Sequence, residues 1–148
     1  MANLSLEKRQ LCDIQGRLFE LALKNGYDCP SFIKAFMNSQ TAAALDDTYD
    51  RLQWAGEEYI LEELNDEVHG LKTAGTIYTN EVMYWTGYTY RYWHYYTGEN
   101  SREIYRTADE KIMKEYPEIL SIRTTVHKPG APVGGIFQDV SVTLEKTR

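Results

Sequence analysis

The sequence predicts a mainly α-helical fold: a helical bundle of three longer and several short helices, with a small β or irregular element at its C-terminal end. Apolar residues recur at steps of three and four over most of the chain. From Ser121 onward they alternate with polar residues instead. We therefore expect a helical domain over residues 1–120 and a C-terminal hairpin or tail over residues 121–148. A chain of 148 residues, 43% of them hydrophobic, is long enough to bury a sizeable core.

The first predicted helix covers residues 4–24, where apolar side chains repeat along one face. These are Leu11, Ile14, Leu18, Leu21 and Ala22. Asn25 and Gly26 follow, and both residue types tolerate the left-handed conformation that ends a helix. A short second helix is predicted after Pro30, with one apolar side. That side holds Phe32, Ile33, Phe36 and Met37.

A third helix is predicted over residues 41–65. Its inner face is expected to hold Leu45, Thr48, Leu52, Ala55, Tyr59 and Leu64. Its far end is acidic, which is unfavourable at the negative end of the helix dipole. The acids are Glu57, Glu58, Glu62, Glu63, Asp66 and Glu67. Such a run is most often a solvated face, but it is also the kind of patch that attracts a basic partner.

Residues 70–79 form a predicted loop, and a helix rich in aromatic residues follows over residues 80–98. Two pairs of residues then match the capping-box pattern that begins a helix. They are Asn100 with Glu103 and Thr107 with Glu110. Two short helices are therefore expected before Pro117, which ends the helical run. Alternation over residues 122–126 and 140–144 predicts two short strands around a turn-rich loop, with a tail as the alternative.

The aromatic helix carries more large rings than one buried stripe normally needs. A helical wheel gathers part of them on one face, which we expect to be core. That set is Val82, Trp85, Tyr92, Trp93 and Tyr96. The surplus is Tyr84, Tyr88, Tyr90 and Tyr95. Because tyrosine, tryptophan and arginine are the residues that most often anchor protein interfaces, the surplus predicts a contact surface.

Arg91 belongs to that predicted surface. It lies three residues after Tyr88 and four before Tyr95, which are facing positions on a helix. Its guanidinium could stack on either ring within the helix. It could also be held by the rings to bind an incoming acid or phosphate. The pattern therefore allows a packing role and a ligand-binding role.

The chain is acidic, and its net charge of −6 is unevenly spread. Residues 1–101 hold 8 Lys+Arg against 15 Asp+Glu, a balance of −7. Residues 102–148 hold 8 against 7, a balance of +1. A basic footprint for nucleic acid is absent, so no direct nucleic-acid binding is expected. An acidic face can instead speed the encounter with a basic protein.

Cys12 and Cys29 have neither metal-ligand spacing nor a disulfide framework, and we expect two reduced, partly buried thiols. Asp66 and His69 match only half of a carboxylate-bridged metal site, so no metal is expected. No stretch approaches the length of a transmembrane helix, and the first ten residues lack the apolar core of a signal peptide. These features predict a cytoplasmic protein that contacts no membrane.

The usual catalytic signatures are missing from the sequence. It contains no GxxxxGKS/T or GxGxxG phosphate loop, no HExxH and no GxSxG. We therefore expect no cofactor and no catalytic residue. A missing motif does not exclude activity, so a small enzyme of unknown reaction stays open as the less favoured reading.

Three segments are distinctive as sequence: QGRLFELA at residues 15–22, RLQWAGEEYILEEL at 51–64 and YWTGYTYRYWHYYTGENSREIY at 84–105. Through them the chain resembles, over residues 11–116, a family of small uncharacterised bacterial proteins with a YRYWHYYTGE-type segment. The resemblance implies an antitoxin-like role, because that family is associated with genes beside toxins. It implies no catalytic residue. Beyond residue 116 the chain departs from the family, for which we would expect a further acidic helix.

These observations favour protein binding, most concretely neutralisation of a partner such as a toxin or another basic protein. The predicted partner-binding residues are Tyr84, Tyr88, Arg91, Tyr95, Glu58, Glu62 and Glu63. Two alternatives stay open. One is a mobile-element or phage inhibitor that blocks a nucleic-acid-binding defence protein through an acidic face, and the other is the small enzyme. The sequence leaves the partner and the oligomeric state open.

Overall fold

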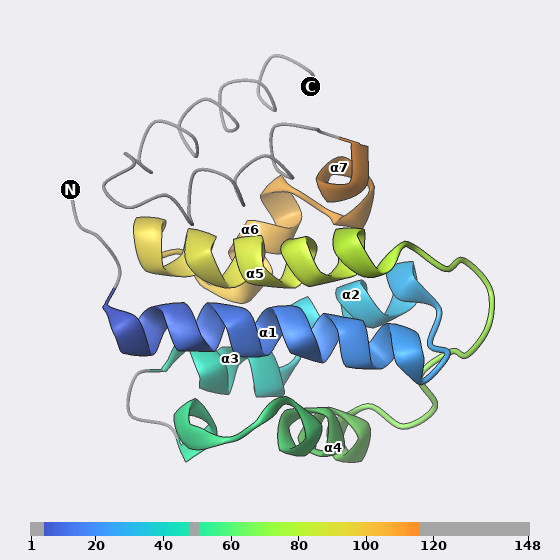
Figure 1. Cartoon of the computed structure of the whole chain (residues 1–148), viewed down its shortest axis with the longest axis horizontal. Helices are drawn as coiled ribbons and strands as arrows, with labels where there is room; N and C mark the ends of the chain where they lie inside the picture. Colours follow the sequence, from blue (N-terminus) through green and yellow to red (C-terminus); the bar gives the residue numbers. More distant parts are fainter. Residues whose placement is uncertain (1–4, 48–50, 116–148) are drawn as a thin grey trace.

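The described part of the chain is helical, which confirms the predicted fold class (Figure 1). The computed structural model describes residues 5–47 and 51–115, so the predicted strands and Pro117 lie outside the described residues. Within those residues, seven α-helices and one 3-10 helix, η1, follow one another. They are α1 (Leu6–Lys24), α2 (Cys29–Met37), α3 (Gln40–Asp46), η1 (Arg51–Trp54), α4 (Glu57–Glu67), α5 (Asn80–Thr97), α6 (Ser101–Thr107) and α7 (Glu110–Glu115).

Helices α1 and α5 lie side by side across the middle of the molecule and run in opposite directions (Figure 1). Contacts at their ends show this antiparallel arrangement. The Lys8 ammonium lies 5.3 Å from the centre of the Tyr95 ring, near the start of α1 and the end of α5. At the other end, Asn80 donates a hydrogen bond of 2.5 Å to Glu20. The pair forms the scaffold on which the other helices pack.

Two glycines set how closely α1 and α5 approach. A β-carbon added at Gly87 would lie 2.5 Å from the carbonyl oxygen of Gln15, and one added at Gly16 would lie 2.7 Å from the Tyr84 ring. Both distances are too short for a side chain to fit without movement. A glycine inside a helix makes that helix less stable than an alanine would. Its presence at both positions is therefore explained by the close approach of α1 and α5.

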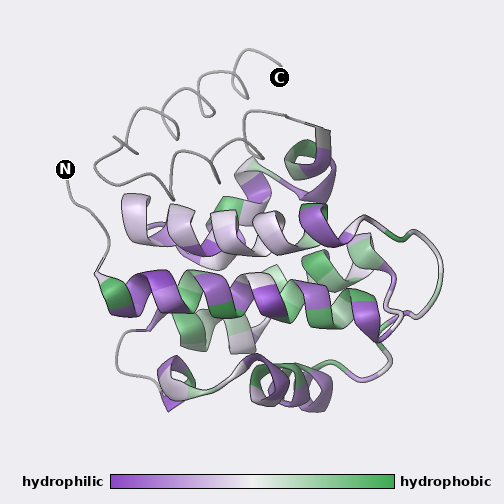
Figure 2. Ribbon diagram, in the orientation of Figure 1, coloured by the Kyte–Doolittle hydropathy of each residue, from purple (hydrophilic) through white to green (hydrophobic). Residues whose placement is uncertain are grey.

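The core between α1, α2 and α5 is aromatic. Phe19 of α1 packs edge-on against Phe32 and Phe36 of α2, with ring centres 5.3 and 5.5 Å apart, and lies 6.4 Å from the ring of Tyr90. The predicted apolar side of α2 is confirmed, since all four of its residues are buried. The predicted face of α1 is buried at Leu18 and Ala22 and partly buried elsewhere. Figure 2 shows α1 as alternating hydrophilic and hydrophobic bands.

The single helix predicted over residues 41–65 is wrong, because the chain forms α3, η1 and α4 there. The backbone turns away from helical geometry at Asp47, and Gly56 begins α4 as its N-cap. The predicted inner face is therefore only partly correct. Leu45, Leu52 and Leu64 are buried and Ala55 partly so, whereas Tyr59 is 42% exposed and Thr48 lies outside the described residues.

Because the predicted helix is divided at Gly56, the acidic residues occupy other helix positions than predicted. Glu57 and Glu58 lie in the first turn of α4, where negative charge is favourable to the helix dipole rather than unfavourable. Glu67 at the other end of α4 accepts hydrogen bonds from the backbone N–H groups of Gln40 (2.7 Å) and Thr41 (2.9 Å). This carboxylate therefore caps the start of α3 and ties α4 to it.

The helix ends near residue 100 follow the sequence closely. Gly98 ends α5 in the left-handed conformation, with φ of 79°. The predicted capping box of Asn100 and Glu103 is confirmed, since both of its hydrogen bonds are present. The second predicted box is wrong. Asp109, not Thr107, accepts the backbone N–H groups at the start of α7, because the Thr107 hydroxyl turns back to the Glu103 carbonyl.

The loop over residues 70–79 joins α4 to α5, as predicted. Asp28, at the start of α2, anchors it by accepting a hydrogen bond of 2.6 Å from the backbone N–H of Thr76. Cys12 and Cys29 are both free thiols in the interior, and burial raises the pKa of each.

Candidate partner-binding surface

The predicted contact surface on α5 is wrong for Tyr88, Tyr90 and Arg91, which are buried, while binding through Tyr84 and Tyr95 stays a prediction. Tyr88 and Arg91 are 2% and 1% exposed, so neither can meet a partner in this structure. Tyr84 and Tyr95 are half-buried and packed against the core. The physical reason is that α5 is covered by α1 on one side and by α6 and α7 on others, so it buries far more than one stripe.

The predicted core face of α5 is shifted for the same reason. Tyr92 and Trp93 are buried, as expected, but Val82 and Trp85 are only partly buried. Tyr96, placed at the centre of the predicted core face, is 40% exposed. A helical wheel finds where rings cluster, but neighbouring helices decide which of those rings are covered.

Arg91 is the centre of a buried polar network. Its Nε donates to the Gln15 side chain at 2.9 Å, and its Nη1 pairs with the Asp46 carboxylate at 2.7 Å. Nη2 lies 3.5 Å from the Ser101 hydroxyl, and Gln15 in turn donates to the carbonyl of Gly87 at 2.9 Å. A buried guanidinium needs such partners, because desolvation without them is costly. The network joins α1, α3, α5 and α6.

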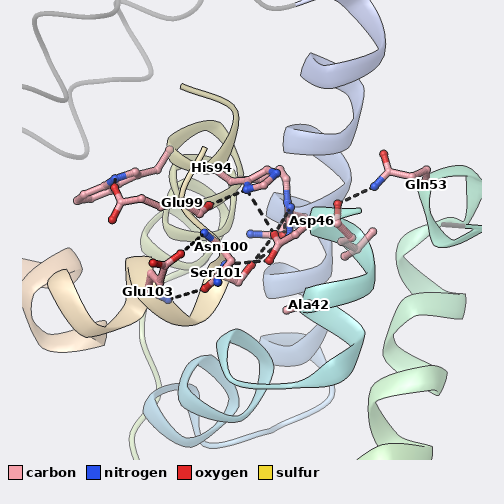
Figure 3. Close-up of polar contacts among 12 residues, drawn as sticks. Ala42, Asp46, Gln53, His94, Glu99, Asn100, Ser101 and Glu103 are labelled. Atoms are coloured by element: carbon pink, nitrogen blue, oxygen red, sulfur yellow. Dashed lines mark hydrogen bonds and ion pairs between the residues drawn. The ribbon is translucent and has the colours of Figure 1, made fainter. Parts of the chain in front are cut away.

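Asp46 collects the other bonds of this network (Figure 3). Its carboxylate accepts both the backbone N–H and the hydroxyl of Ser101, each at 2.9 Å. Nδ1 of His94 lies 3.7 Å from that carboxylate and 2.7 Å from the carbonyl oxygen of Glu99. Burial, and after it the charge of Arg91, lowers the pKa of His94 although Asp46 opposes the shift.

Ser101, His94 and Asp46 are the residue types of a nucleophilic triad, but their geometry does not fit one. In a triad the histidine stands between the acid and the hydroxyl. Here the Ser101 hydroxyl donates directly to Asp46, and His94 Nδ1 faces the carbonyl of Glu99. Ser101 is also only 3% exposed. These groups hold helices together, and their geometry gives no support to an enzyme reading.

The half-buried tyrosines are used in contacts with α1. The Tyr84 hydroxyl donates to Asp13, and burial together with that carboxylate raises the pKa of Tyr84. Tyr95 lies under the Lys8 ammonium, and burial raises the pKa of Tyr95 to about 12. Both rings therefore contribute to the α1–α5 contact.

A further patch of exposed side chains lies on η1 and α4. We call this patch the η1–α4 surface; it comprises Arg51, Trp54, Glu58, Tyr59, Glu62 and Glu63. Trp54 is 83% exposed, far more than any ring of α5, and Tyr59 is 42% exposed. Isolated apolar side chains on a surface are ordinary, but a nearly bare tryptophan in a segment rich in exposed charged residues is typical of an interface.

Arg51 organises this surface. Its Nη1 donates to the Tyr59 hydroxyl at 2.6 Å, and its Nη2 lies 3.2 Å from the Glu63 carboxylate. The guanidinium carbon lies 5.8 Å from the centre of the Tyr59 ring. Among the described residues, Glu58 and Glu62 are exposed and have no ion-pair partner.

A groove of about 400 Å³ runs beside Arg51 between α3 and α4. It is lined by Gln40, Thr41, Ala44, Arg51, Leu52, Glu63, Asp66 and Glu67. Burial disfavours the charge of Glu67, but its bonds from Gln40 and Thr41 outweigh this and hold the pKa of that carboxyl below its usual range. The groove therefore has an acidic rim at the α4 side.

The predicted site residues fall into two separate regions. Glu58, Glu62 and Glu63 lie together on α4, whereas the predicted residues of α5 lie on the other side of α1 (Figure 1). Binding by the three glutamates stays a prediction. Sequence reasoning missed Arg51 and Trp54, because an unbroken helix over 41–65 gave them no special place. The signal that could have found them is Gly56, a helix-weakening residue directly before the acidic run.

The described residues hold no cluster of metal ligands. Over residues 5–47 and 51–115, no three His, Cys, Asp or Glu side chains come close enough to share an ion. Asp66 and His69 are both exposed. In the same part of the chain, every helix is too short or too polar to cross a membrane.

No protein-family model, curated protein or solved structure matches this chain. The family resemblance carried by residues 15–22, 51–64 and 84–105 therefore stays a prediction. The η1–α4 surface is the feature of the molecule from which a function can best be inferred.

Proposed function

We propose that this protein is a protein-binding module that neutralises a basic partner through the η1–α4 surface, in the manner of an antitoxin. The observation that carries the proposal is Trp54, which is 83% exposed in η1, directly before α4 with its exposed Glu58 and Glu62, for which the described residues offer no ion-pair partner. The family resemblance supports the antitoxin-like form of the proposal.

Trp54 has the properties of an anchor residue. Tryptophan is among the residues most enriched at the energetic centres of interfaces. Burying a whole tryptophan side chain of about 150–250 Å², at roughly 25 cal/mol per Å², gives about 4–6 kcal/mol before the costs of association. One such residue can therefore dominate the affinity of a complex.

The charge of α4 favours a basic partner. Residues 57–67 contain six acidic residues and no basic one. Glu67 caps α3 and Glu63 pairs with Arg51, whereas Glu58 and Glu62 are exposed and, within residues 5–47 and 51–115, have no cation bound to them. Such exposed charges act mainly on the association rate and over about 8 Å at physiological salt.

The test begins with the protein that co-purifies with this chain from its own host, and measures the Kd of that complex for purified variants. We expect Trp54→Ala to weaken the complex at least about tenfold, since an anchor residue contributes about 1.4 kcal/mol or more. Ile77→Ala is the matched control, because Ile77 is an exposed apolar residue (53%) in the loop before α5. It should change the Kd by less than about twofold.

The antitoxin-like form has its own readout. Expression of the partner alone should stop growth, wild-type protein should restore it, and Trp54→Ala should fail to do so. An equal Kd for wild type and Trp54→Ala, with melting curves unchanged, would remove the η1–α4 surface from the proposal. A partner that is harmless when expressed alone would remove the antitoxin-like role but leave protein binding.

One observation favours a second candidate, inhibition of a nucleic-acid-binding protein. Glu58, Glu62 and Asp66 are exposed at four-residue steps, so their carboxylates follow one side of α4 about 6 Å apart along the axis. A regular line of acids can occupy a groove built for phosphates. Competition decides between the two: the partner should lose DNA or RNA binding when this protein is added, and Glu58→Lys/Glu62→Lys should abolish the competition. A partner that never binds nucleic acid excludes this candidate.

A further inference from the structure

We propose that Tyr59 and Glu63 form a seat for a guanidinium group, which Arg51 fills in the free protein and which an arginine of the partner takes by displacing Arg51. This inference rests on the proposed function, because it names the chemistry by which the η1–α4 surface recognises a basic partner. Under this proposal, Tyr59 and Glu63 make the contact that selects an arginine of the partner.

The seat is defined by the contacts that Arg51 already makes. Two nitrogens of one guanidinium are used at once, Nη1 at the Tyr59 hydroxyl (2.6 Å) and Nη2 at the Glu63 carboxylate (3.2 Å). The guanidinium carbon also lies within 5.8 Å of the Tyr59 ring centre, which is the range of a cation–π contact. The chain itself thus demonstrates that this pair of side chains accommodates a guanidinium.

Arg51 is held loosely enough to be displaced. Its side chain is 69% exposed, and that of Glu63 is 31% exposed. Exposed ion pairs contribute little to stability, because water screens the charges and both side chains lose freedom on pairing. The partner's arginine therefore competes with a weakly bound occupant, whereas the same group deep in the protein, Arg91, could not be exchanged.

The surroundings favour an arginine over a lysine. The planar guanidinium offers several donors in a fixed fork and stacks on rings, whereas an ammonium is a compact point charge. Next to the seat, the groove presents Ala44 and Leu52 as apolar lining and Asp66 as a further carboxylate. This allows an arginine stem to lie along apolar area while its head group reaches Tyr59 and Glu63.

Two short peptides, hexa-arginine and hexa-lysine, test the seat with the full chain. Their Kd values are measured by calorimetry for wild type, Arg51→Ala, Arg51→Ala/Tyr59→Phe and Arg17→Ala. The last variant is a stringent control. Arg17 also forms an exposed arginine–carboxylate pair, with Asp13, and its charge interacts electrostatically with Glu57 of α4. It removes the same charge without emptying the seat.

Arg51→Ala should bind hexa-arginine about twofold to fivefold tighter than Arg17→Ala does, which is the range of an exposed pair. Hexa-lysine should not distinguish these two variants, and adding Tyr59→Phe should remove the gain for hexa-arginine. Equal gains for Arg51→Ala and Arg17→Ala, or equal gains with both peptides, would overturn the seat while leaving a cation-binding surface in place. Absence of binding by either peptide to every variant would overturn the seat and the preference for a basic partner together, and Trp54→Ala would then test protein binding alone.

Discussion

Helix α5 and the η1–α4 surface both combine aromatic rings with charged groups, but they use them differently. In α5 the polar atoms of two buried large side chains are bonded inside the protein: the Tyr90 hydroxyl donates to the carbonyl of Ala108 at 2.6 Å, and the Trp93 ring N–H to Glu99 at 3.2 Å. On the η1–α4 surface, Trp54 is almost fully exposed and Arg51 makes a pair that solvent can reach.

The difference follows from position in the bundle rather than from composition. Helix α5 packs against α1, α6 and α7, whereas α4 lies at the edge of the molecule and packs mainly on α1 and α3 (Figure 1). Hydropathy does not reveal this, since α5 has pale, intermediate colours along most of its length (Figure 2). Tyrosine and tryptophan are amphipathic, so a helix made of them can be core if its polar tips find partners.

The largest expected effect is the loss of stability when the buried network of α5 is disrupted. Arg91→Ala should lower the free energy of unfolding by about 3–5 kcal/mol, because it leaves the Asp46 carboxylate, only 10% exposed, without its cation and removes one hydrogen bond each from Gln15 and Ser101. Urea unfolding monitored by circular dichroism measures this.

Arg102→Ala is the matched control for that measurement. Arg102 is an exposed arginine that donates to the carbonyl of Asn38 and lies within reach of the charge of Glu67, so its loss should cost less than about 1 kcal/mol. If Arg91→Ala were as mild as the control, Arg91 would not be an interior residue, and the contrast between the two regions would fail.

A smaller effect is expected where α5 meets α1. Gly87→Ala should cost about 1–3 kcal/mol, because the new methyl group would be pressed against the carbonyl of Gln15. Gly56→Ala is the comparison at the start of α4, where nothing lies within 4 Å of an added β-carbon. Melting temperatures of the two variants show the difference. A Gly87→Ala protein as stable as Gly56→Ala would mean that the helices are further apart than the structure has them.

The sequence was sufficient where a feature depends on neighbours along the chain. The ends of α1 and α5, the apolar side of α2 and the capping box at Asn100 all follow from local chemistry and spacing. It was insufficient for Asp46 and Glu67. Both look like surface acids in the sequence, and both are bonded to residues more than twenty positions away.

The candidate site shows the same limit. The acids Glu58, Glu62 and Glu63 could be predicted, since six charges in eleven residues stand out without a fold. Tyr88 and Arg91 were placed wrongly because their burial depends on α1, α3 and α6, which no local pattern encodes. Trp54 was missed because its exposure depends on the break between η1 and α4.

The smallest expected effect is the pH dependence of stability that His94 of α5 causes. Burial and the charge of Arg91 hold the pKa of His94 below its ordinary value of 6.5, so the unfolded chain binds a proton that the folded protein resists. The stabilisation from neutral His94 is therefore complete above about pH 6.5 and is lost as the pH falls through the folded pKa. Asp28 and Glu67, whose pKa values are also lowered, lose their stabilisation only below their ordinary values of 3.8 and 4.5.

Melting curves of the wild type should accordingly fall in temperature between about pH 7.5 and pH 5. His94→Gln should flatten that fall, because glutamine keeps a polar side chain but cannot take up a proton in this range. His69→Gln, at an exposed position beyond α4, should leave the fall unchanged. A wild-type slope that persists in His94→Gln would show that the buried network accepts a second positive charge beside Arg91. The interior of α5 would then tolerate charge as the η1–α4 surface does, and the distinction between the two regions would rest on burial alone.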